Sequence, residues 1–167
     1  MSMDHYKSWP GLNKRLSGLL CDPLKGRISY FLTRYHTVHD AYGRASIRLD
    51  GNELVCFSWI EQYRQEGDLH ALWEGTGRWD SQNAALKEKW DQAGTYCEMD
   101  FLSAALAFLQ MPIRAALDSE NYMIKIFAIL DRRTGARTLK AIADSGEFLT
   151  YPDWVKQFYC LRLYFCK

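Results

Sequence analysis

The sequence predicts an α+β fold with an N-terminal helix, a three-stranded antiparallel meander and a mostly helical C-terminal half packed on it. Two patterns support this prediction. Residues 27–59 alternate between apolar and polar side chains around a tight turn, and from Asp100 onward apolar residues recur at helical spacing. The chain has 167 residues, 48% of them hydrophobic, which suits one well-buried domain (1–167) and is short for two.

The first helix is predicted over residues 9–21. Ser8 or Trp9 opens it, and Pro10 is tolerated in its first turn, where the missing N–H has no intrahelical partner to lose. Asp22-Pro23 ends the helix, because a residue before proline is pushed out of the helical region.

Three strands are predicted over residues 27–36, 44–49 and 53–59. The first carries bulky side chains on both sides, so we expect it to be central or covered on both faces. Asp50-Gly51 joins the second and third strands in a two-residue type I′ turn, in which both central residues take positive φ.

This turn sets the register of the predicted hairpin. It places the pairs Ile47–Leu54 and Ala45–Cys56 on one face of the hairpin. The pairs Arg48–Glu53 and Ser46–Val55 lie on the other face. Apolar residues then meet apolar ones and opposite charges meet, as a sheet with one buried face requires.

The second half of the chain is predicted to be helical after an unclear stretch. Residues 60–79 are expected to form a variable loop region packed by its own aromatics. Helices are predicted over residues 80–93, 100–110, 112–118, 120–132, 136–143 and 152–165. Asp100 and Ser119 are the expected N-caps of two of them, and Gly94 is an expected stop. The isoleucines of 120–132 also favour a strand, but the segment is long and well capped, so a buried helix is predicted.

The composition argues against a membrane protein and against a secreted one. The longest apolar run is far below the ~18 residues needed to cross a membrane, and residues 1–9 contain no apolar signal core. The five cysteines form no C-x-x-C pair, which favours reduced, buried thiols. We therefore expect a cytoplasmic protein with no cofactor and no membrane partner, and the sequence leaves its oligomeric state open.

The overall charge of +1 conceals an uneven distribution. The net charge is +5 over residues 1–49, −7 over residues 50–100 and +3 over residues 101–167. Such segments either neutralise one another in the fold or form a basic surface beside an acidic one.

The densest polar block contains Arg132, Arg133 and Arg137. Cations at a helix end complement the helix dipole, and Asp131 is placed to brace one arginine through a bidentate pair. One interpretation is an anion or nucleic-acid site. The other is structural, with the arginines joining neighbouring helices and satisfying exposed carbonyls.

A second basic group, Arg44 and Arg48, is predicted on the solvent side of the sheet. With Tyr30 and Phe57 nearby, this face could receive single-stranded nucleic acid through stacking and phosphate contacts. Glu53 already pairs with Arg48, however, which favours a structural role.

Trp73 and Trp79 are the candidate interaction patch, because tryptophan is enriched at protein interfaces. We find no catalytic or metal-binding constellation: His36-x-x-His39 lacks a third ligand, and Cys97 lacks a neighbouring histidine. The best interpretation is a non-catalytic binding or regulatory module that contacts an unidentified protein partner. A nucleic-acid or anion binder is the alternative, and a small-molecule enzyme ranks third.

Segments at both ends of the chain resemble a small family of uncharacterised bacterial proteins. They are Trp9-x-x-Leu12 followed by Leu24-Lys25-Gly26-Arg27, the block from Ala128 to Leu139, and Pro152-x-Trp154 leading to Phe158-Tyr159-x-Leu161-Arg162. Residues 60–98 lie outside the resemblance. It implies a cytosolic bacterial protein and assigns no catalytic residue.

Overall fold

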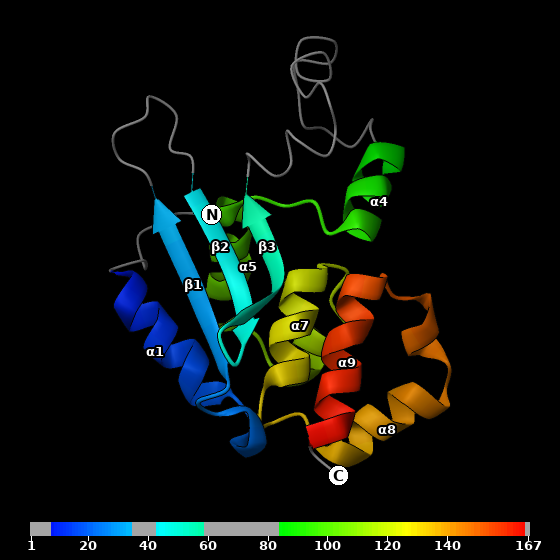
Figure 1. The fold of residues 1–167 in the computed structure, drawn as a ribbon. Coiled ribbons are helices and arrows are strands. Elements are labelled where there is room, and N and C mark those ends of the chain that lie inside the picture. Colours follow the sequence, from blue (N-terminus) through cyan, green and yellow to red (C-terminus); the bar gives the residue numbers. More distant parts are fainter. Residues whose placement is uncertain (1–7, 35–42, 59–83, 166–167) are drawn as a thin grey trace.

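The computed structural model describes residues 8–34, 43–58 and 84–165, and it confirms the predicted fold class (Figure 1). Helix α1 (Trp9–Leu19) precedes an antiparallel sheet of three strands in the order β1-β2-β3, and a mostly helical half follows. The strands are β1 (Ile28–Arg34), β2 (Gly43–Leu49) and β3 (Asn52–Ser58). The later helices are α4 (Ala84–Ala93), α5 (Glu98–Phe108), α6 (Ile113–Leu117), α7 (Tyr122–Leu130), α8 (Ala136–Asp144) and α9 (Asp153–Phe165).

Helix α1 begins where the sequence predicts and ends two residues early. The Ser8 hydroxyl accepts a hydrogen bond from the Gly11 N–H at 3.4 Å, which caps the first turn. The predicted end at residue 21 is wrong because Leu20 leaves the helix and pairs with Asp131 in an isolated β-bridge. Asp22-Pro23 then lies in a short 3-10 helix, η2 (Asp22–Leu24), that the sequence analysis did not predict.

The hairpin turn forms as predicted. Asp50 and Gly51 have φ of 50° and 85°, and Arg48 pairs with Glu53. Beyond that pair a β-bulge shifts the register by one residue, so the other predicted pairs are wrong.

After the bulge, Ile47 faces Val55 and Ala45 faces Phe57. The predicted register would have turned Phe57 outward, whereas the bulge turns it into the core, where 1% of the residue is exposed. Beyond the first pair after the turn, burial of the Phe57 ring therefore decides the register of the hairpin.

Strand β1 lies at an edge of the sheet, so the expectation of a central position is wrong. Its side chains still divide cleanly between the two faces. Tyr30 is buried and Phe31 on the opposite face is half-buried, with the Arg48 guanidinium 4.3 Å from the centre of its ring. The bulk on the second side of the strand is thus covered by an arginine.

One face of the sheet is closed by helices. The Phe101 ring of α5 stacks on Phe57 with ring centres 5.7 Å apart, and the Phe127 ring of α7 lies 5.7 Å from Tyr30. Figure 1 shows α5 behind the sheet and no helix of the described ranges in front of it. The sheet therefore has a buried face and a face that the described helices leave open.

Helix α7 settles the ambiguous segment as a helix, with ends inside the predicted 120–132. Asn121 rather than Ser119 is the N-cap, and its side chain accepts from the N–H groups of Met123 and Ile124. The helix ends at Leu130 because Asp131 adopts an extended conformation and pairs with Leu20.

Three further details of the helical half differ from or extend the predictions. Asp100 does not start α5; it lies in the first turn, where its carboxylate accepts from the N–H of the N-cap, Cys97, at 2.9 Å. Gly94 follows α4 with a φ of 71°, as the predicted stop requires. A short 3-10 helix, η4 (Glu147–Thr150), precedes α9 and was not predicted. Residues 59–83, which include the predicted loop region, lie outside the described ranges.

Candidate functional site

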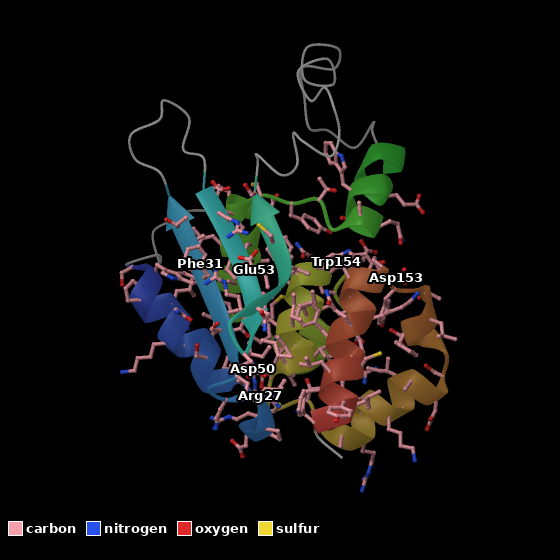
Figure 2. All side chains as sticks on the ribbon, viewed as in Figure 1. Arg27, Phe31, Asp50, Glu53, Asp153 and Trp154 are labelled. Carbon is pink, nitrogen blue, oxygen red and sulfur yellow. The ribbon has the colours of Figure 1, made fainter. Side chains whose placement is uncertain are left out.

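The open face of the sheet carries the strongest candidate site. Strand alternation places a single row from each strand on this side: Ser29, Phe31, Thr33, Arg44, Ser46, Arg48, Glu53, Cys56 and Ser58. Of these residues, Ser46 and Ser58 are buried. Figure 2 shows the labelled residues Phe31 and Glu53 on the side of the sheet that faces the viewer. We call these nine residues the open face.

The centre of the open face is a carboxylate held between two arginines. Arg44 donates to one oxygen of Glu53, Oε2, and Arg48 donates to the other, Oε1, at 3.1 Å. Partial burial acts to raise the pKa of the Glu53 carboxyl, but hydrogen bonds from Arg48, Ser46 and Arg44 outweigh it and hold that pKa below its usual value. Glu53 is therefore ionised at neutral pH.

Both guanidinium groups are also held by contacts other than Glu53. The Arg44 Nε donates to the Cys56 sulfur at 3.1 Å, and the Arg48 Nε donates to the Ser46 hydroxyl at 3.2 Å. Arg48 additionally lies over the Phe31 ring. The two cations are thus oriented by the sheet itself.

The aromatic residues expected on this basic face are not there. Tyr30 and Phe57 point to the opposite face and are 5% and 1% exposed. The ring that does lie on the open face, Phe31, has Arg48 over it. The sequence does not predict which ring lies on the open face. Tyr30 and Phe31 are neighbours on opposite faces of β1, and only the helices packed on the sheet decide which ring points inward.

The fold divides the other predicted basic group, Arg132, Arg133 and Arg137. Asp131 is 1% exposed. The Arg133 Nε donates to the Asp131 Oδ1 at 3.1 Å and to its Oδ2 at 3.0 Å, and the Arg133 Nη2 donates to Oδ2 at 2.7 Å, so the predicted bidentate pair forms. Arg132 and Arg137 are exposed. Neither of these two forms an ion pair with another residue of the described ranges.

The arginine that joins helices in this region is Arg162 of α9, which the site prediction left out. It is 4% exposed and donates to the carbonyls of Ile129 at 3.0 Å, Thr134 at 2.9 Å and Asp131 at 3.4 Å. Arg162 follows Phe158 and Tyr159 at helical spacing, four and three residues later, and this position on the apolar face is the sequence signal that could have marked it as buried.

A buried lysine inside α7 was also missed. The Lys125 ammonium donates to the Leu117 carbonyl at 2.8 Å and to the Tyr151 hydroxyl at 3.4 Å, and Tyr151 in turn donates to Glu147. Burial lowers the pKa of Lys125, although the charges of Glu147 and Asp118 act to raise it. Because Leu117 is the last residue of α6, this lysine neutralises a helix C-terminus.

The remaining sequence candidates give no further site. Trp73, Trp79, His36 and His39 lie outside the described residues. Cys97 is buried, and its burial raises the pKa of the thiol to about 12, which disfavours a thiolate nucleophile. Across residues 8–34, 43–58 and 84–165, no group of His, Cys, Asp or Glu is suited to hold a metal ion.

The block from Ala128 to Leu139, which carried part of the family resemblance, contacts the C-terminal segment through Arg162. The Arg132 N–H donates to the Leu19 carbonyl at 2.8 Å, and the Cys21 N–H donates to the Leu130 carbonyl at 3.0 Å, which ties the N-terminal segment to the end of α7. The chain belongs to the SF0329 protein family. Its family pattern matches residues 8–163, and thus also spans residues 60–98, which the resemblance had left out.

No curated protein and no solved structure matches this SF0329 chain. The described parts of the chain also contain no helix that is both long enough and apolar enough to span a membrane.

Proposed function

We propose that this SF0329 protein is a non-catalytic binding or regulatory module that holds a partner protein against the open face of its sheet. The observation that carries the proposal is the asymmetry of the sheet. One face is packed with the rings of α5 and α7, while the other presents Arg44, Arg48 and Phe31 in a fixed arrangement. Arginine is among the residues that dominate binding energy at protein interfaces.

The arrangement favours a protein partner over single-stranded nucleic acid. Sequence-tolerant binding of single strands relies on several aromatic rings that stack on bases. On this sheet Tyr30 and Phe57 are buried against the helices, and Phe31 already lies under Arg48. The face therefore offers hydrogen-bond donors without a stacking platform.

The proposal places the protein in the bacterial cytoplasm. Its support is the state of the cysteines and the family resemblance. Cys21 and Cys97 are buried, and no disulfide joins cysteines within residues 8–34, 43–58 and 84–165. Reduced thiols suit a reducing compartment.

The exposed pair Arg132 and Arg137 supports a second candidate function, the binding of a nucleic acid or another anion. Both side chains are exposed near the C-terminal end of α7 and the start of α8. Fluorescence anisotropy with mixed-sequence oligonucleotides at low and near-physiological salt tests this candidate, since phosphate contacts weaken steeply with salt. Binding that survives ~150 mM salt and is lost in the Arg132→Ala/Arg137→Ala variant supports it; absence of binding at low salt removes it.

The test of the main proposal is site-specific photocrosslinking in cells. A photoreactive residue replaces Ser29, which is exposed on the open face, and in a control it replaces Lys140, which is exposed on α8. We expect an adduct of defined mass from position 29, absent from position 140 and lost when Arg44→Ala and Arg48→Ala are added. Identical adducts from both positions, or none from position 29, would contradict the proposal.

A further inference from the structure

The open face contains a carboxylate site that the protein fills with its own side chain. Glu53 receives one arginine on each of its oxygens, Arg44 on Oε2 and Arg48 on Oε1. Charge-assisted hydrogen bonds from guanidinium groups can recognise a carboxylate of any origin.

The two arginines do not depend on Glu53 for their orientation. Arg44 is held by Cys56 at 3.1 Å, and Arg48 is held by Ser46 at 3.2 Å and by the Phe31 ring. When Glu53 leaves, both cations therefore stay in place and point toward the same position. Preorganisation of this kind reduces the entropy cost of binding.

Glu53 is free to leave without disturbing the core. It lies on the edge strand β3, directly before the bulge, and its side chain is 29% exposed. The side chains of Arg44 and Arg48 are 37% and 28% exposed, so an incoming group can reach them. Two cations face one anion, which leaves an uncompensated positive charge.

The geometry points to an acidic segment of a partner protein as the occupant of this site, with a carboxylate of the partner replacing Glu53 between Arg44 and Arg48. This inference rests on the proposed function and specifies the chemistry of the partner. Glu53 then acts as an internal competitor, so that isolated carboxylates bind poorly and a segment with several acidic residues displaces it. Charge complementarity of this type mainly determines specificity and association rate.

The test measures the anisotropy of a fluorescein-labelled peptide of ten glutamates, at low salt, with the full chain and its variants. Removing the internal competitor by Glu53→Gln should tighten binding about two- to fivefold, the range expected for one partly exposed ion pair. Arg44→Ala/Arg48→Ala should weaken binding below that of the unmodified protein. Glu53→Ala serves as a second variant if Glu53→Gln is poorly folded by circular dichroism.

The matched control is Asp118→Asn. It changes the net charge by the same amount and also removes a carboxylate from an exposed ion pair with an arginine, Arg114, but on α6 and its C-cap rather than on the sheet. It should leave the affinity for the peptide unchanged. Equal tightening by Asp118→Asn and Glu53→Gln would mean that net charge alone acts, and would overturn the inference, as would no effect of Glu53→Gln.

A labelled ten-residue oligo-dT is measured in parallel. Tighter binding of oligo-dT than of the peptide to Glu53→Gln, lost in the double arginine variant, would assign the face to nucleic acid and overturn the acidic-protein partner. The inference fails separately from the proposed function: adducts from position 29 that persist while Glu53→Gln has no effect would refute only the role of Glu53.

Discussion

Replacing Arg162 by methionine tests whether this buried arginine holds the C-terminal half together. The side chain donates to the carbonyls of Ile129 at 3.0 Å and Thr134 at 2.9 Å, and makes a longer contact of 3.4 Å with the Asp131 carbonyl. These carbonyls lie at the end of α7 and in the turn after it, where the helix supplies no partner. Arg162→Met keeps an apolar stem and removes every donor.

The expected cost follows from the two well-formed bonds. A hydrogen bond with a charged donor contributes about 1.5–3 kcal/mol, and a buried carbonyl left without a donor carries a similar penalty. Arg162→Met should therefore lower the free energy of unfolding by about 3–5 kcal/mol, a large part of the total stability of an ordinary domain.

Urea unfolding followed by circular dichroism measures this change. Arg162→Lys should recover part of the loss, because one ammonium group cannot reach all three carbonyls. Arg114→Met is the matched control, since the Arg114 side chain is 76% exposed and its ion pair with Asp118 contributes little, about 0.5 kcal/mol. A loss below about 1 kcal/mol for Arg162→Met, or one equal to that of Arg114→Met, would refute the reasoning.

Three further predictions concern buried groups. Burial lowers the pKa of Lys125 below its usual 10.5, so the unfolded chain binds a proton at this residue more tightly than the folded chain does. The contribution of Lys125 to the free energy of unfolding therefore rises with pH up to about pH 10.5. In urea unfolding, the stability of the unmodified protein relative to Lys125→Met should increase between pH 7 and 10, and a constant difference would contradict this prediction. Gly43→Ala should destabilise by about 1–3 kcal/mol in the same assay, because a Cβ would lie 2.4 Å from Cγ of the fully buried Glu98, and an unchanged midpoint would show that Glu98 moves aside. Phe57→Ala should lower the free energy of unfolding by about 3–5 kcal/mol, and Cys56→Ala by far less, because the bulge turns Phe57 into the core and Cys56 to the open face. In thermal or urea unfolding, a larger loss for Cys56→Ala than for Phe57→Ala would mean that the bulge is absent.

The sequence predicts one part of the candidate site, the pair of Arg48 and Glu53, and not the other. The Asp50-Gly51 turn is enough to place Glu53 opposite Arg48, and that pair forms. The contact between Arg44 and Cys56 is different, since the predicted register places Cys56 on the buried face and the bulge turns it to the open face. This second contact of Arg44 therefore depends on the bulge, which the strand pattern does not reveal.

The sequence by itself determined the features that rest on local backbone preferences. The order of helix, meander and helices follows from the spacing of apolar residues, and the positive φ of Gly51 and Gly94 marks a turn and a helix end. Each of these signals is contained within a few neighbouring residues, so it does not depend on what the chain packs against.

Only the tertiary structure decided the features that depend on distant partners. Helix α7 ends at Leu130 because Leu20, far along the chain, supplies a bridge to Asp131. Arg162 is buried because three carbonyls lie within its reach, and Phe57 faces inward because α5 offers it a ring to stack on. Hydrogen-bond satisfaction and close packing are properties of the assembled core, and no local stretch of sequence specifies them alone.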